Sequence, residues 1–365
     1  MKQIHNISSY RAYMARRHFG SLDGIRAIAI IGVLWHHTTQ PIEWLPISAR
    51  GFLGVDLFFV LSGYLIVTLM LRERDRHGHI SLSKFYMRRT LRIFPVYYAL
   101  LFILAILFGV VARGGGLAVP FMATLPFYVT YTSNWTAIDE GSLLAIAWSL
   151  ATEEQFYLVW PPIEKYLKRA LFPILGVLFV LNQLINYGVI FTEAHARLEV
   201  LQSTFTPILL GVLLAHLMHS KDWYERIHQA VGNRYASAVF ALIIIALLNI
   251  YPLGTDISGT PRLLIHLAMV GFMASCVANE EHVLASVMKS KPIVQLGVVS
   301  YGMYLFHMLI VITAQAVLGR VGLDNMFVLF VVVMIGTYIV SELSFRFYEM
   351  PFLRLKKRWA TAPTH

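Results

Sequence analysis

The chain has 365 residues, of which 57% are hydrophobic and only 14% are charged, and its mean hydropathy is +0.63. Soluble domains of this total length need polar surfaces, and the chain has too few charges to cover them. The lone Cys276 excludes a disulfide framework and a cysteine-based zinc site. The net charge of +10 is explained by membrane topology, so we expect no nucleic-acid partner.

Apolar stretches of about 20 residues, the length that crosses a bilayer, recur along the chain. We therefore expect an all-α polytopic membrane protein of about ten transmembrane helices. The expected spans are 22–40, 51–71, 93–112, 143–163, 170–191, 204–218, 235–251, 262–279, 294–318 and 326–345. A further apolar segment at 118–133 contains Pro120 and Pro126, and it either crosses the membrane or lies in the outer interface.

The distribution of Lys and Arg predicts the topology. Basic clusters occur in the N-terminal segment, in the loop from Arg72 to Arg92, at 165–169, 221–234 and 289–291, and from Arg354 to Arg358. All of them face the cytoplasm only if 118–133 does not cross. We therefore expect cytoplasmic N- and C-termini, in the cell inner (plasma) membrane, and no cleavable signal peptide. The expected divisions are a cytoplasmic segment at 1–21, one transmembrane domain at 22–352 and a basic tail at 353–365.

The first two spans carry ionisable side chains that are costly inside a membrane. Arg26 and His37 are eleven residues apart, so they share one helix face at a separation of about 16 Å along the axis. Alternatively, Arg26 reaches the lipid headgroups and His37 lies at the outer interface. Asp56 lies near the start of the second span, and we expect it to pair with a histidine of the first span, unless it is an interfacial or helix-capping residue.

Arginines and carboxylates follow in the third and fourth spans. Arg88, Arg89 and Arg92 lie at the cytoplasmic end of the third span, where they bind phosphate groups or simply contact anionic lipid. Glu153 and Glu154 lie in the fourth span and point about 100° apart, so at least one faces the interior of the bundle. A structural ion pair is the alternative.

The ninth span places Ser300, Tyr304 and His307 on one face by their spacing of four and three residues. This polar stripe belongs to a site, or His307 is an ordinary core histidine. Glu342, Arg346 and Glu349 share a face at the end of the last span, where they can pair with one another. The histidines lack the spacing of a zinc site, so we expect no metal.

Six segments in this order resemble the acyltransferase-3 family of integral membrane O-acyltransferases. They are LDGIRAIAIIGVLWHH, GVDLFFVLSGYLI, RRTLRIFP, WSLATEEQFYLVWP, SYGMYLFH and FYEMPF. The resemblance implies transfer of an acyl group, expected to be acetyl, from cytoplasmic acyl-CoA to a hydroxyl of a glycan or glycoside. The Arg-ten-residues-His signature of the family falls on Arg26 and His37, and its Arg-x-x-Arg signature falls on Arg89 and Arg92. The chain resembles the standalone type, without a C-terminal hydrolase-like domain.

The resemblance and the spacing together give a hypothesis for the site. His37 is a general base or a transient acyl carrier, assisted by Arg26, Asp56, Glu153 or Glu154, and His307. The acyl-CoA phosphates bind Arg88, Arg89 and Arg92, and the acceptor side is lined by Ser300, Tyr304 and Glu349. A secondary transporter or exporter of a glycan or small molecule is the alternative function, and a scaffolding protein leaves the buried charges unexplained. The sequence leaves the acceptor and the oligomeric state open.

Overall fold

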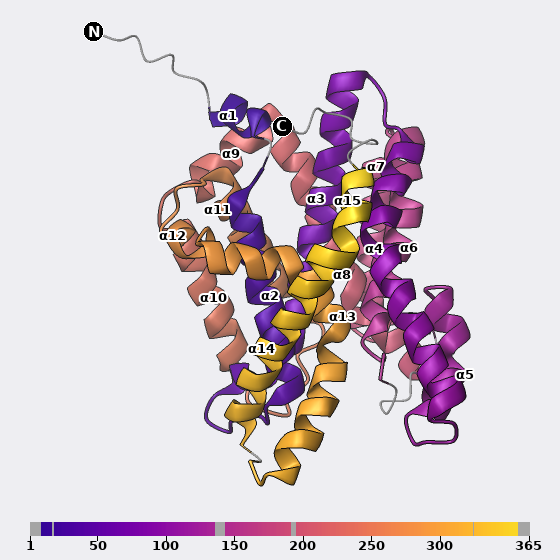
Figure 1. Cartoon of the computed structure of the whole chain (residues 1–365). Coiled ribbons are helices and arrows are strands. Elements are labelled where there is room, and N and C mark those ends of the chain that lie inside the picture. Colours follow the sequence, from indigo (N-terminus) through magenta and orange to yellow (C-terminus); the bar gives the residue numbers. More distant parts are fainter. Residues whose placement is uncertain (1–8, 17, 136–142, 191–194, 324, 357–365) are drawn as a thin grey trace. The chain divides into compact units, whose positions relative to one another are not determined.

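The chain is built from helices in a computed structural model that describes residues 9–16, 18–135, 143–190, 195–323 and 325–356 (Figure 1). Helices account for 81% of the described residues, and no strand occurs in these ranges, which confirms the all-helical prediction. The α-helices are α1 (Ser9–Ala15), α2 (Gly20–Thr38), α3 (Gly54–His77), α4 (Leu82–Ile106), α5 (Ala118–Val129), α6 (Ala147–Tyr166), α7 (Leu171–Asn186), α8 (His195–His219), α9 (Lys221–Val231), α10 (Ala236–Ile250), α11 (Thr260–Ala278), α12 (Ala285–Met288), α13 (Lys291–Arg320), α14 (Met326–Leu343) and α15 (Met350–Lys356). Short 3-10 turns are η1 (Pro46–Ala49), η2 (Gly51–Leu53) and η4 (Ser133–Trp135), and π-helical turns are η3 (Leu107–Val111) and η5 (Ser344–Glu349).

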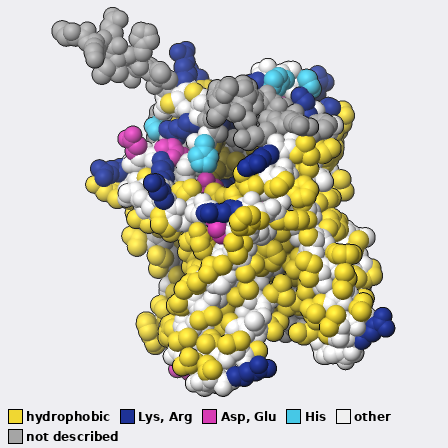
Figure 2. Space-filling model, in the orientation of Figure 1, with side chains coloured by type: hydrophobic (Ala, Val, Ile, Leu, Met, Phe, Trp, Pro, Cys, Tyr) yellow, Lys and Arg dark blue, Asp and Glu magenta, His cyan; other side chains and the backbone are white. Residues whose placement is uncertain are grey.

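Five helical segments within the described residues are long and apolar enough to cross a membrane, or seven if each of two bent helix pairs is one span. The five are Gly51–His77, Leu82–Val111, Thr260–Ala278, Lys291–Arg320 and Met326–Leu355. Large apolar side chains such as Phe102, Leu242 and Ile335 are exposed, and hydrophobic atoms cover most of the visible surface in Figure 2. The chain is therefore a multi-pass membrane protein, whereas the count of ten spans stays a prediction.

The difference in count has a physical basis. Helix α6 was expected to span the membrane, but Glu153, Glu154 and Gln155 make its middle polar. Helix α7 has 16 residues, which is shorter than the length that crosses about 30 Å of hydrocarbon. The length and composition of such helices do not by themselves place them inside the membrane, so packing against neighbouring helices is needed to hold them there.

The apolar segment at 118–133 forms a short helix that packs beside α4. Helix α5 has 12 residues, about 18 Å, and is too short to cross. The phenol of Tyr97 donates to the Tyr128 carbonyl oxygen at 2.9 Å, and that of Tyr98 donates to the Val129 carbonyl oxygen at 2.9 Å. That 118–133 does not cross the membrane, on which the predicted topology depends, stays a prediction.

The chain divides into two compact units, and α2, α3, α8 and α13 contribute to both. The first unit contains 1–33, 41–71 and 205–298. Two glycines let α3 and α8 approach closely within it. A Cβ at Gly63 would lie 2.2 Å from the Ile208 carbonyl oxygen, and one at Gly211 would lie 2.2 Å from the Val60 carbonyl oxygen. Glycine is required at both positions because any side chain would strike the facing backbone.

The second unit contains 34–40, 72–204 and 299–365. Its core includes Tyr97, Tyr128, Trp160 and Met303, all nearly fully buried. The phenol of Tyr301 on α13 donates to the Ile93 carbonyl oxygen of α4 at 3.1 Å. Helices α4, α6 and α13 carry most of the candidate residues, so this unit positions the site. Neither the N-terminal segment nor the basic tail is fully within the described residues, and the predicted domain limits stay predictions.

Candidate functional site

His37 of α2 and His307 of α13 lie side by side in the second unit. Their ring centroids are 5.0 Å apart, and the ring planes are inclined by 47°. His307 is completely buried. The ring of His36 packs edge-on against His37 at 5.1 Å. The sequence marked His37 and His307 separately as candidates, and the structure brings them together.

Hydrogen bonding defines the tautomer of His307. Its Nδ1 lies 2.7 Å from the Tyr304 carbonyl oxygen. A carbonyl oxygen only accepts, so in the neutral ring Nδ1 carries the hydrogen and Nε2 carries the lone pair. That Nε2 is buried and has no hydrogen-bond partner in the described part of the chain. An unoccupied acceptor nitrogen therefore lies beside the ring of His37.

Tyr304 and Ser300 share the polar face of α13 with His307, and all three side chains are buried. The Tyr304 phenol donates to the Ile146 carbonyl oxygen at 3.0 Å and lies 2.6 Å from the Ser149 hydroxyl. Ser149 in turn donates to the same carbonyl at 3.1 Å. This closed network ties α13 to α6, and it engages the phenol hydrogen of Tyr304, a residue that we expected to line the acceptor side.

The two adjacent carboxylates of α6 face different neighbours. Glu153 lies within electrostatic range of Tyr304 and Tyr301. Glu154 lies within range of Arg89 on α4 and of the phenols of Tyr97 and Tyr131. Both carboxylates thus lie within electrostatic range of Tyr301 in the second unit, and Arg89 acts on Glu154.

The three arginines of α4 have separate environments. Arg88 donates to the Glu73 carboxylate at 3.1 Å. The guanidinium of Arg89 lies 3.8 Å from the centre of the Tyr157 ring, and its buried Nε has no hydrogen-bond partner among the described residues. Arg92 lies within electrostatic range of Glu349, which accepts a hydrogen bond from Ser344 at 3.0 Å. Arg89 therefore keeps an unused donor at Nε.

Arg26 and Asp56 belong to the first unit, where their partners are clear. Arg26 forms an ion pair with Asp23, one turn before it on α2. Asp56 is buried, and its Oδ2 accepts from Arg262 Nε at 2.7 Å and lies 2.8 Å from His266 Nε2. The predicted Asp–His pair thus exists, but the prediction named the wrong histidine, because the partner comes from α11 and not from the first span.

The end of the last span contains a further predicted contact. Arg346 Nε donates to Glu342 at 2.5 Å, as the spacing of four residues predicted. In the described residues, no three His, Cys, Asp or Glu side chains converge as a metal site.

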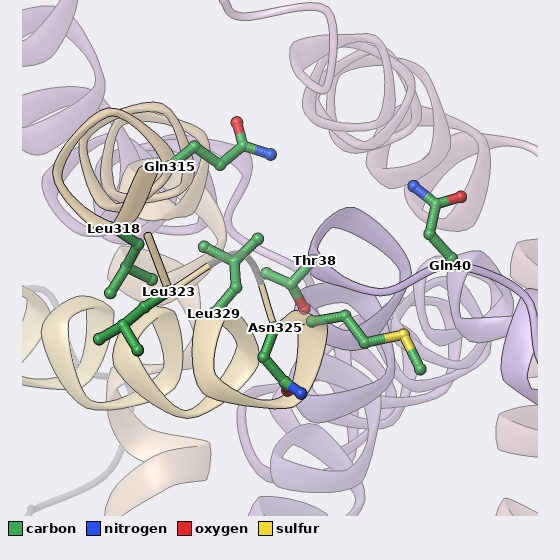
Figure 3. A pocket seen from close by; sticks show the side chains of 8 residues that line it. Thr38, Gln40, Gln315, Leu318, Leu323, Asn325 and Leu329 are labelled. Carbon is green, nitrogen blue, oxygen red and sulfur yellow. The ribbon is translucent and has the colours of Figure 1, made fainter. Parts of the chain in front are cut away.

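A small pocket lies in the second unit near the end of α2 and between the facing ends of α13 and α14 (Figure 3). Its volume is about 240 Å³. Its lining residues are uncharged and include three side-chain amides; they are Thr38, Gln40, Gln315, Leu318, Leu323, Asn325, Met326 and Leu329. Thr38 follows His37 directly, and Leu318 lies three turns beyond His307 on nearly the same face of α13.

Comparison with known families decides the affiliation. Residues 19–345 match the acyltransferase domain of the acyltransferase-3 family. The chain belongs to the acyltransferase-3 family. The family resemblance is thereby confirmed over nearly the whole chain, and five of the six segments lie within the matched residues, whereas FYEMPF follows them.

Individual relatives of this acyltransferase-3 chain are larger proteins. Peptidoglycan O-acetyltransferase OatA of Listeria monocytogenes is 28% identical over 361 residues, covering 92% of this chain and 56% of that protein. O-acetyltransferase OatA of Staphylococcus aureus is 28% identical over 360 residues, covering 92% of this chain and 57% of that protein. The chain therefore spans less than three-fifths of the length of these curated relatives. No solved structure matches it.

Two residues of the acyltransferase-3 chain escaped the sequence reasoning. Arg262 and His266, the partners of Asp56, are spaced by four residues at the start of α11. A cation and a histidine on one face of an apolar helix are a recognisable signal of a buried carboxylate partner. The signal was missed because we sought the partner of Asp56 among its neighbours in the sequence.

Proposed function

We propose that the protein is a membrane-embedded O-acyltransferase that moves an acyl group, expected to be acetyl, from cytoplasmic acyl-CoA to a hydroxyl of a carbohydrate. The observation that carries this proposal is the contact of His37 with His307, because the free Nε2 of His307 leaves a buried basic nitrogen beside a second imidazole. The name of the Listeria relative, a peptidoglycan O-acetyltransferase, supports a cell-envelope glycan as the acceptor.

The acyl-CoA donor binds next to α4. Arg89, with its unpaired Nε, and Arg92 bind the phosphates of acyl-CoA, whereas Arg88 is engaged by Glu73. Helix α6 leads from this region to the histidines, since Tyr157 stacks on Arg89 and Ser149 contacts Tyr304, one turn from His307. The flexible arm of the donor follows α6 and brings the thioester to His37.

The chemistry requires one base and an oriented imidazole. His37 removes the proton of the acceptor hydroxyl, and the oxygen attacks the thioester carbonyl carbon. The tetrahedral intermediate then expels the CoA thiolate, which takes up the proton from the imidazolium and leaves as free CoA. His307 Nε2 has no hydrogen-bond partner in the described part of the free protein, and during the reaction its lone pair accepts a hydrogen from His37 and so orients that ring. Glu153, which lies within electrostatic range of Tyr304, stabilises the positive charge of the imidazolium.

The acceptor enters from the pocket beyond His37. Its amides and its lack of charged lining residues suit a neutral sugar unit, and about 240 Å³ is less than the roughly 300–1,000 Å³ of pockets that hold drug-sized ligands. One unit of a glycan, rather than a longer stretch, is therefore bound here. Arg26 and Asp56 form ion pairs within the first unit, Arg26 with Asp23 and Asp56 with Arg262 and His266.

The experiment supplies labelled acetyl-CoA and a soluble glycoside to the purified protein in lipid nanodiscs. We expect an O-acetylated glycoside and an equal amount of free CoA, and we expect His37→Ala to lower the rate by about 10²–10⁴-fold. Retained transfer in His37→Ala, in a protein that still folds, would contradict the role of His37. Movement of glycoside across the membrane of proteoliposomes without ester formation would favour the transporter instead.

We place the protein in the inner (plasma) membrane with both termini in the cytoplasm. This orientation gives the arginines of α4 access to cytoplasmic acyl-CoA and places the pocket on the opposite side, where an envelope glycan is accessible. The excess of Lys and Arg in alternate loops supports it.

A further inference from the structure

Tyr131 has an unusual backbone conformation for a bulky residue. Its φ of 53° is positive, and it is the one non-glycine residue with a positive φ in the described ranges. It ends α5 in a hydrogen-bonded cap, in which Tyr131 N donates to the Tyr128 carbonyl oxygen at 3.3 Å and Thr132 N donates to the Phe127 carbonyl oxygen at 2.9 Å. Glycine usually occupies this capping position because it adopts the left-handed conformation without strain. The presence of tyrosine here therefore needs an account.

The ring of Tyr131 supplies part of that account. It stacks on Tyr97 with centroids 4.5 Å apart and on Phe94 at 5.6 Å, and it meets the edge of Tyr98 at 6.0 Å. The side chain is 7% exposed. Phenylalanine would make the same stacking contacts, so the packing explains the ring but not the hydroxyl.

The hydroxyl of Tyr131 is buried and has no hydrogen-bond partner within the described part of the chain. Burying an unpaired hydroxyl is unfavourable, and unpaired buried polar groups in folded proteins are uncommon. Its neighbours in the stack are different, because Tyr97 and Tyr98 both donate to carbonyl oxygens of α5. Among these three phenols only Tyr131 retains an unused donor.

The loop that carries Tyr131 is held in place by a fork of side-chain amides. Gln155 Nε2 donates to the Tyr131 carbonyl oxygen and to Asn134 Oδ1, each at 2.8 Å, and Gln155 Oε1 accepts from Asn134 at 3.2 Å and from Trp135 at 3.0 Å. Gln155 follows Glu154 on α6, so the same helix that presents the carboxylate also fixes the strained residue. Strain that the surroundings impose in this way is characteristic of ligand sites.

The surroundings indicate which ligand would use the hydroxyl. Tyr131 stacks on Phe94, which follows Arg92 by two residues on α4, and Glu154 lies within electrostatic range of both Tyr131 and Arg89, so the ring lies close to the segment of α4 that carries the arginines. A phenol hydrogen pairs with an acceptor such as a carbonyl oxygen. The arm of acyl-CoA carries such acceptors in its two amides and its thioester.

We propose that Tyr131 is part of the donor site and that its hydroxyl donates a hydrogen bond to a carbonyl oxygen of the acyl-CoA arm. This inference rests on the proposed function, because it takes acyl-CoA as the donor. The stacked rings hold the phenol in position before the donor binds, so the hydrogen bond forms without further ordering of the side chain. Tyr131 is thereby a donor-binding residue that no sequence motif marks.

The test compares Tyr131→Phe with Tyr97→Phe in purified protein, by calorimetric titration with acetyl-CoA and by thermal unfolding without ligand. Tyr131→Phe removes a hydroxyl that has no partner in the free protein, so we expect an unchanged or higher Tm together with about tenfold weaker acetyl-CoA binding. Tyr97→Phe removes a hydroxyl that pairs with α5, so we expect a lower Tm and unchanged binding. If the hydroxyl of Tyr131 had a purely structural role, Tyr131→Phe would lower the Tm and leave the affinity for acetyl-CoA unchanged.

A titration with CoA distinguishes the possible acceptors. Weaker binding of both CoA and acetyl-CoA to Tyr131→Phe assigns the bond to an amide of the arm, and weaker binding of acetyl-CoA alone assigns it to the thioester. Unchanged affinity of Tyr131→Phe for both ligands would overturn the inference while the proposed function stands. If the unaltered protein binds neither ligand, the proposed donor is wrong, and this inference fails with it.

Discussion

The imidazole rings of His307 and His37 lie side by side, and Nε2 of His307, which carries no hydrogen, has no hydrogen-bond partner in the described part of the chain. The centroid separation of 5.0 Å and the hydrogen bond from Nδ1 to the Tyr304 carbonyl oxygen define this relationship. An ordinary core histidine, which was the alternative for His307, has both ring nitrogens satisfied. The unpaired Nε2 favours a functional role.

This relationship predicts the behaviour of His307→Asn. The asparagine amide reproduces the donor at the Nδ1 position, so the bond to the Tyr304 carbonyl and the fold are retained, but the acceptor at the Nε2 position is lost. We expect a fall in kcat of at least about tenfold, the factor that corresponds to one hydrogen bond, with unchanged affinity for acetyl-CoA. Single-turnover rates and thermal unfolding measure the two effects. A kcat equal to that of the unaltered protein would return His307 to the role of a core residue.

The buried cluster around Asp56 predicts a large effect on stability. Asp56→Ala leaves the largely buried Arg262 without its carboxylate, and breaking a buried ion pair in this way costs up to about 3–5 kcal/mol. We expect a lower unfolding temperature in detergent. The double variant Asp56→Leu with Arg262→Met removes both charges and should recover much of the loss. Asp256→Asn, at an exposed position, is the control and should have little effect.

The sequence predicted which residues are candidates better than it predicted which residues they contact. Periodic apolar segments and the distribution of Lys and Arg predicted an all-helical membrane protein, because lipid imposes those patterns on every spanning helix. The contact of His37 with His307 and that of Asp56 with His266 join helices far apart in the chain, and helical spacing carries no information about such packing. Tyr131 became a candidate only through its backbone conformation and its unpaired hydroxyl.

The close approach of α3 and α8 predicts that Gly63 cannot be replaced. In Gly63→Ala the new Cβ would lie 2.2 Å from the Ile208 carbonyl oxygen, so the helices must separate. We expect a loss of about 1–3 kcal/mol in the free energy of unfolding. Gly176→Ala on α7 is the matched control, because nothing lies within 4 Å of its Cβ position and alanine favours the helix. Equal stability of the two variants would contradict this close packing.

The predicted topology can be tested with single cysteines. Cys276 is buried, and Cys276→Ser provides a cysteine-free background. In that background we expect Asp256→Cys to react with a membrane-impermeant maleimide in intact cells, and Lys168→Cys to react only after the cells are opened. If 118–133 crossed the membrane, 165–169 would lie outside and Lys168→Cys would react in intact cells. The Lys168→Cys result therefore tests whether 118–133 crosses the membrane, a question that the sequence analysis answered from the positive charges.

His282 predicts how the stability of the first unit depends on pH. It lies outside the spanning helices, buried with Nε2 3.0 Å from the Ser21 hydroxyl and Nδ1 2.9 Å from the Ser237 hydroxyl. Burial, and to a lesser extent the charge of Lys289, lowers its pKa to about 4 from the ordinary value of 6.5. Between these two values the unfolded chain binds more protons than the folded chain, so stability rises with pH over this window.

We therefore expect the unfolding temperature to fall as the pH is lowered from 6.5 to about 4, and His282→Asn to flatten this dependence. Asparagine retains a partner for Ser237 and cannot take up a proton. His79→Asn, in an exposed loop, is the control and should keep the dependence of the unaltered protein. If the unfolding temperature depends on pH as steeply in His282→Asn as in the control, another group is responsible. His282, buried in its neutral form, is the group that links proton uptake to the opening of this contact between α2 and α10.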